Sequence, residues 1–155
     1  MALWLFGSLL VQVTLAHFLT VRGVVPSFVL LVVIWYALRA DIRWAALLGA
    51  IAGFCEDALA GSTGGAWTIS TTVAAIAVSL LSRGFFADSI PLVTVIAAAG
   101  TLIRALTFWI VMGFEGYPAG IGSVHAHQAV LQAALNAIVV ALAMLVIRRF
   151  DLRTG

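Results

Sequence analysis

The sequence contains little charge and no lysine. Asp, Glu, Lys and Arg together make up 9% of its 155 residues, against about 25% in an average soluble domain. Hydrophobic residues make up 64%. A soluble domain of this length still exposes about 30% of the surface of its unfolded chain, so it could not hide this much apolar side chain from water. The composition therefore excludes a soluble globular protein and indicates a protein embedded in a lipid bilayer.

Chemically reactive patterns are also scarce. The one cysteine, Cys55, excludes an intrachain disulfide, and no Cys and His pattern has the spacing of a zinc site. His125 and His127 are two residues apart and would diverge on a helix, so we expect no metal there. No nucleophile elbow, P-loop or HExxH pattern occurs, and a net charge of +2 without runs of like charge does not favour nucleic acid. We expect no enzyme activity, no cofactor, no metal and no nucleic-acid partner.

Continuous apolar runs, without the alternation of membrane β-strands, predict transmembrane helices. Crossing the hydrocarbon layer takes about 20 mainly apolar residues. We therefore expect an all-α fold, a single transmembrane domain over residues 1–155 with six helices. Their predicted ranges are 3–21, 24–38, 44–60, 66–81, 90–113 and 124–147. The second is short, about 22 Å long at 1.5 Å per residue, so it either spans a thinned bilayer, which we expect, or forms a re-entrant or interfacial segment.

The arginines indicate the orientation of this bundle. With six spans, one side carries Arg22 alone, and Arg104 lies within a helix. The opposite side carries Arg39, Arg43, Arg83, Arg148, Arg149 and Arg153. Because short cytoplasmic loops retain positive charge, the arginine-rich side is predicted to be cytoplasmic, and both termini with it.

Three charged residues fall inside the predicted spans: Glu56, Asp57 and Arg104. A charge at this depth is unfavourable unless it is paired or hydrated. Asp57 and Arg104 lie about 20 and 21 Å along their helices from the cytoplasmic side. We therefore predict that Asp57 pairs with Arg104. The pair either locks two helices together or lines a polar cavity or docking site in the outer half of the membrane.

Small residues recur every four positions in two of the helices, a spacing that favours close helix packing or a partner face. The first stripe comprises Gly49, Gly53 and Gly61 and includes Asp57; the second comprises Ala129, Ala133, Ala137 and Ala141. Beside the second stripe runs a polar line of Gln128, Gln132 and Asn136. With Arg104 this line predicts either a pocket open to the outside or hydrogen bonds between helices.

The order of features between residues 22 and 83 resembles a known family. A proline heads a short apolar helix, a basic turn follows, and then come a glycine-rich helix ending in an acid, a glycine-containing loop and a helix ending at an arginine. These features are Pro26, Arg39 and Arg43, Gly49 with Gly53 and Asp57, Gly61 to Gly65, and Arg83. This order is similar to MreD, the small membrane subunit of the bacterial rod-shape elongation machinery. Family members often have Asp directly after the proline, whereas Ser27 stands here, so a role for an acid does not carry over.

The resemblance implies a non-catalytic, multi-pass protein of the bacterial cytoplasmic (inner) membrane, with a fold similar to the substrate-binding subunits of ECF vitamin transporters. It implies an MreC-like partner and joint action with a RodA-type glycosyltransferase, its class B penicillin-binding transpeptidase and MreB filaments. We therefore expect a scaffold or regulatory subunit of peptidoglycan synthesis that helps to control cell shape. The alternative is a small-ligand-binding subunit similar to those ECF components, which the outward concentration of polar residues favours.

Overall fold

The computed structural model describes residues 7, 23–61, 64–83, 89–116 and 122–154. These residues form five α-helices and no strand. The helices are α2 (Phe28–Ala37), α3 (Ile42–Ala60), α4 (Ala66–Ser82), α5 (Ile90–Phe114) and α6 (Gly122–Thr154). The helical class and the positions of α3 to α6 are confirmed, with α6 continuing past its predicted end. The predicted helix over 3–21 lies outside the described residues, apart from Gly7.

The helix predicted over 24–38 is shorter than expected. α2 has ten residues and is about 15 Å long at 1.5 Å per residue, so the predicted helix range was too long, chiefly at its beginning. Pro26 disfavours a helical conformation in the residue before it. Ser27 then begins the helix as its N-cap, with extended backbone angles and a hydroxyl that accepts a hydrogen bond from the Leu30 N–H. Residues 24–27 therefore precede the helix as non-helical chain.

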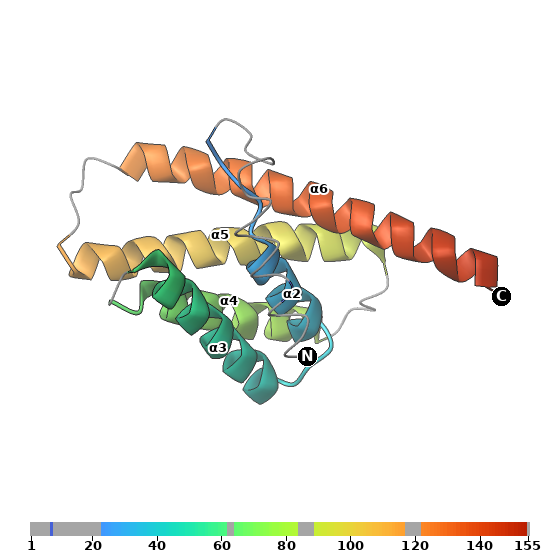
Figure 1. Cartoon of the computed structure of the whole chain (residues 1–155), viewed down its shortest axis with the longest axis horizontal. Coiled ribbons are helices and arrows are strands. Elements are labelled where there is room, and N and C mark those ends of the chain that lie inside the picture. Colours follow the sequence, from blue (N-terminus) through green and yellow to red (C-terminus); the bar gives the residue numbers. More distant parts are fainter. Residues whose placement is uncertain (1–6, 8–22, 62–63, 84–88, 117–121, 155) are drawn as a thin grey trace.

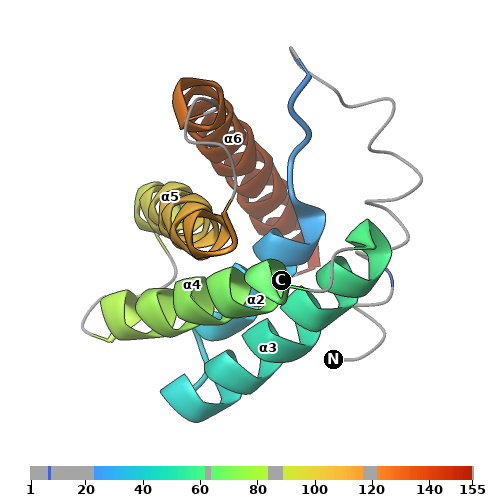
Figure 2. The ribbon, with the colours of Figure 1, turned by 90° about the vertical axis from the view of Figure 1, so that its left-hand side faces the viewer.

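α2 lies at the centre of the described helices. It contacts α3, α4, α5 and α6. Among those four helices, α3 packs against α4, α4 against α5 and α5 against α6 (Figures 1 and 2). Most of its residues are buried, with Val29, Leu30 and Val33 fully so, whereas Trp35 is partly exposed. A helix that is apolar on all sides is stable in this position because no face has to meet water. α2 thus forms the core of the molecule.

The glycine stripe of α3 brings that helix close to α4. A Cβ atom added to Gly53 would lie 2.5 Å from the Thr68 Cα, and one added to Gly49 would lie 2.9 Å from the Ala75 Cβ. The packing face predicted for Gly49 and Gly53 is therefore present. Gly61 does not belong to it, because it ends α3 in the left-handed conformation with φ of 66°. A left-handed residue after a helix favours glycine, which has no Cβ to clash.

The alanine stripe of α6 is only partly buried. Ala133 is enclosed, whereas Ala129, Ala137 and Ala141 are half-buried. The buried line on this helix consists of Ala133, Asn136, Val140 and Met144. The face of α6 that meets the other helices is therefore centred beside the predicted stripe, so that the other three alanines flank it.

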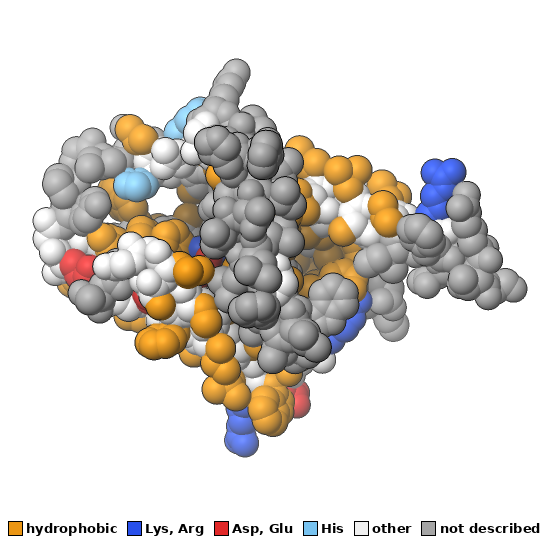
Figure 3. Space-filling view, viewed as in Figure 1, with side chains coloured by type: hydrophobic (Ala, Val, Ile, Leu, Met, Phe, Trp, Pro, Cys, Tyr) orange, Lys and Arg blue, Asp and Glu red, His pale blue; other side chains and the backbone are white. Residues whose placement is uncertain are grey.

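Large apolar side chains cover much of the outer surface. Hydrophobic side chains line α6 and the lower part of the molecule in Figure 3. Exposed examples include Phe54 on α3, Leu106 on α5 and Leu142 on α6. By length and composition, α5 and residues Val124–Val146 of α6 are sufficient to cross a membrane. A soluble monomer rarely exposes apolar patches of this extent, so the surface suits lipid.

The close approach at Gly53 generates a prediction for Gly53→Ala. Alanine normally favours a helix over glycine, but here its Cβ would meet the α4 backbone, and overpacking of this kind costs about 1–3 kcal/mol. We expect a lower midpoint of thermal unfolding for the purified protein in detergent. Gly113→Ala is the matched control, because nothing in the described part of the chain lies within 4 Å of the added Cβ. Equal midpoints for the two variants would contradict the packing.

A buried ion pair as the candidate functional site

Arg104 of α5 lies at the centre of a buried polar cluster. Its Nη2 donates to the Glu56 Oε1 at 3.0 Å, and the two side chains are 5% and 8% exposed. Its Nη1 donates to the Ser27 hydroxyl at 2.9 Å. The guanidinium also lies over the Trp67 ring, 4.5 Å from the centroid. One arginine thus contacts residues of α3 and α4 and the N-cap of α2.

The ion pair involves Glu56, whereas the predicted partner of Arg104 was Asp57. Successive residues on a helix point about 100° apart, so only one of the two carboxylates faces α5. The second oxygen of Glu56 accepts a hydrogen bond from the Thr71 hydroxyl at 3.3 Å. The pair joins α3 and α5, the two helices predicted for it, but the acidic residue assigned to it was wrong.

Asp57 instead binds the beginning of α4. Its carboxylate accepts hydrogen bonds from the Trp67 N–H at 3.2 Å, the Thr68 N–H at 2.9 Å and the Thr68 hydroxyl at 2.7 Å. These N–H groups belong to the first turn of a helix, where no carbonyl of the same helix can pair with them. The N-cap of α4 is Gly65, which has no side chain to accept them. A negative charge is favourable at this end of a helix dipole, so Asp57 caps α4 from α3.

Asn136 and Gln132 extend the polar contacts to α6. The Asn136 Oδ1 accepts from the Ser27 N–H at 2.9 Å, and its Nδ2 donates to the Thr101 hydroxyl at 3.0 Å. Gln132 donates to the Val25 carbonyl at 3.0 Å. These side chains bind backbone groups of the non-helical chain before α2. Gln128 lies exposed on α6, so the predicted polar line contributes two of its three members.

Five contributors to these contacts were not predicted as site residues: Ser27, Trp67, Thr68, Thr71 and Thr101. Serine and threonine often bond to the backbone of their own helix and so give a weak indication in a sequence. Thr72 and Thr107 do this in the structure. The sequence could have indicated Ser27 as a site residue, because it follows a proline at the head of a short helix and can act as the N-cap of that helix.

The buried polar groups of the cluster find their hydrogen-bond partners within the protein. Within the described ranges, no buried side-chain nitrogen or oxygen atom lacks a hydrogen-bond partner. Its charged members, Glu56 and Arg104, neutralise each other, and the surrounding hydroxyl and amide groups bind one another or the backbone. Such an arrangement can hold α2, α3, α4, α5 and α6 in one relative position.

A comparison with protein families matches residues 1–150 to rod shape-determining protein MreD. The chain belongs to the MreD family. Comparisons with curated proteins and with solved structures found no match. Family membership makes this a membrane protein with a role in rod-shape determination. MreD is a shape-determining family and not a known enzyme family.

The ion pair gives a first prediction for this MreD-family protein. Glu56→Gln leaves the Arg104 charge buried without its carboxylate, and breaking a buried pair costs about 3–5 kcal/mol. We expect strong destabilisation in a thermal or denaturant unfolding assay in detergent micelles. Changing both residues, as Glu56→Leu with Arg104→Met, should recover most of the loss because no charge is then buried.

Two further variants test the geometry of this pair. Asp57→Asn removes the adjacent charge but keeps an acceptor for the α4 N–H groups, so we expect a loss of only about 1 kcal/mol. Ser27→Asp added to Glu56→Gln should restore part of the stability, because position 27 already contacts the other guanidinium nitrogen. If Asp57→Asn were the more damaging single change, the assignment of Glu56 as counter-ion would fail.

A separate prediction concerns Asn136. Asn136→Leu removes the acceptor of the buried Ser27 N–H, and an unsatisfied buried donor costs about 1–3 kcal/mol. We expect a corresponding fall in unfolding free energy, measured as for the ion pair. Gln128→Leu on the same helix is the control, and we expect it to be near neutral because Gln128 is exposed. Indistinguishable losses would refute a specific role for Asn136.

Proposed function

We propose that this MreD-family protein is a non-catalytic membrane scaffold of the peptidoglycan elongation machinery and that it binds an MreC-like partner. The observation that carries the proposal is that the buried polar groups of the cluster form their hydrogen bonds with other groups of this chain. Glu56, Arg104 and Asn136 are buried and bind residues of this chain. A buried site of this kind fixes the shape of the protein, and its outer apolar surfaces remain for partners and lipid.

The same observation weighs against the alternative of a small-ligand-binding subunit. A ligand site needs a few convergent polar groups that are open to the ligand. Here the convergent groups already have partners, and Gln128 of the predicted polar line lies away from them on the exposed surface. We therefore assign the polar residues to the stability of the scaffold.

We propose a six-helix arrangement in the bacterial inner membrane, with both termini in the cytoplasm and residues 3–21 as the additional helix. Successive helices α3 to α6 run in alternating directions (Figure 1), which suits repeated crossing. This arrangement directs the ends carrying Arg39, Arg43, Arg83 and Arg148 to one side. It also agrees with the expected fold similar to ECF substrate-binding subunits, and it leaves MreB filaments within reach of the cytoplasmic surface.

The face of α3 directed away from the core is the surface that we propose for the partner. Its exposed apolar side chains recur at three- and four-residue intervals: Trp44, Leu47, Ile51 and Phe54. This spacing forms one continuous stripe along a helix. A single membrane helix of an MreC-like protein could pack along it, and the RodA-type glycosyltransferase and its transpeptidase would join through that partner.

Purification from native membranes with site-specific photo-crosslinking tests this function. We expect a crosslinker at position 54 to capture an MreC-like protein, and a crosslinker at the buried position Ala52 to capture none. Phe54→Ala should reduce co-purification of the partner while leaving the unfolding midpoint close to that of the unchanged protein. Absence of any cell-wall synthesis protein from gently solubilised complexes would argue against the scaffold. A thermal shift with a vitamin would instead favour the ligand-binding alternative.

A further inference from the structure

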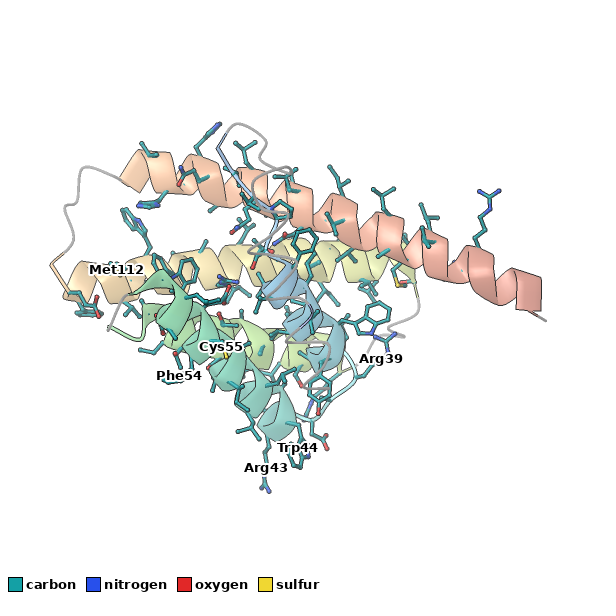
Figure 4. The ribbon with its side chains drawn as sticks, in the orientation of Figure 1. Arg39, Arg43, Trp44, Phe54, Cys55 and Met112 are labelled. Carbon is teal, nitrogen blue, oxygen red and sulfur yellow. The ribbon has the colours of Figure 1, made fainter. Side chains whose placement is uncertain are left out.

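The beginning of α3 and the end of α4 form an open hollow that the polar cluster does not explain. Its volume is about 480 Å³, and its lining consists of Asp41, Ile42, Arg43, Trp44 and Arg83. Figure 4 shows Arg43 and Trp44 at the free lower end of α3. The Trp44 side chain is 58% exposed. Two arginines and an exposed indole thus share one concave surface.

The backbone around this hollow is anchored. The Ser79 hydroxyl of α4 donates to the Ala40 carbonyl at 2.9 Å, and Ser79 is buried. This bond ties the turn before α3 to the last part of α4. Gly49 holds the same two helices close together further along. The walls that carry the arginines therefore have a defined separation, although the side chains themselves reach into solvent.

The positive charge of the hollow is poorly neutralised within the protein. Arg83 Nη2 lies 3.8 Å from Asp41 Oδ1, and both side chains are largely exposed. This distance is well beyond the roughly 2.8 Å of a charge-assisted hydrogen bond, and exposed pairs of this kind are weak. Arg43 forms no ion pair with any other residue that the structure describes. An anion entering the hollow would meet two arginines and one competing carboxylate.

We propose that this hollow binds the phosphate of an anionic phospholipid in the cytoplasmic leaflet. Guanidinium groups suit phosphate oxygens because they donate several hydrogen bonds in one plane, and tryptophan favours the level of the lipid headgroups. The exposed apolar side chains of Leu80 and Leu81 precede Arg83 on α4, and they provide a surface for the acyl chains that is separate from the partner stripe of α3. A lipid satisfies both features, whereas free phosphate satisfies only the arginines.

Native mass spectrometry of the purified full-length protein, titrated with phosphatidylglycerol or phosphatidylcholine, tests this site. An arginine near an anionic lipid surface contributes about fivefold to binding. We therefore expect Arg43→Gln with Arg83→Gln to lower the affinity for phosphatidylglycerol roughly tenfold or more. Asp41→Asn should raise it, because the competing carboxylate is lost. Binding of phosphatidylcholine should change little in either variant.

The matched control is Arg148→Gln with Arg149→Gln, which removes the same charge from α6 outside the hollow. Equal losses in the two double variants would overturn the proposal and indicate only a general attraction of lipid to basic surface. Competition by millimolar inorganic phosphate as effective as that by the lipid would also overturn it, because the acyl chains would then contribute nothing. The assay contains no partner protein, so its result is independent of the proposed scaffold function.

Discussion

The buried charge of Arg104 is the constraint on which the described structure depends. A guanidinium is always protonated and presents five N–H donors, so it cannot enter an apolar interior without acceptors and a counter-ion. Glu56 supplies the charge, Ser27 supplies a hydroxyl acceptor, and Trp67 covers the guanidinium face. These residues come from α3, the N-cap of α2 and α4. The arrangement of one side chain thus determines where three other elements lie.

The central position of α2 follows from the same interactions. A non-helical chain inside a membrane protein is tolerated only where other protein groups satisfy its backbone. Asn136 accepts from the Ser27 N–H, and Gln132 donates to the Val25 carbonyl. With these groups paired, a helix of ten residues can begin inside the molecule, surrounded by its neighbours. The polar side chains of α6 thereby permit a short core helix that is preceded by non-helical chain inside the molecule.

These features divide the molecule into a polar interior and an apolar exterior. Inside, the carboxylates have structural partners: Glu56 balances Arg104, and Asp57 caps α4. Outside, α3, α5 and α6 present large apolar side chains, and the arginines of the α2–α3 turn and the end of α4 lie beside an exposed tryptophan. This division suits the membrane scaffold that we propose, because its partners and lipids would contact the exterior while the interior keeps that surface in a constant shape.

The sequence by itself determined the helical class, the membrane environment, the positions of α3 to α6 and the close packing at Gly49 and Gly53, because these depend on hydropathy, helix breakers and local spacing. It also indicated that Arg104 has an acidic partner at the same depth. Only the tertiary structure decided that the partner is Glu56, since the rotation of α3 about its axis distinguishes two adjacent carboxylates. It likewise decided that α2 is short and that Ser27 joins the cluster, because both depend on residues of α5 and α6: Arg104 and Asn136 lie 77 and 109 residues beyond Ser27.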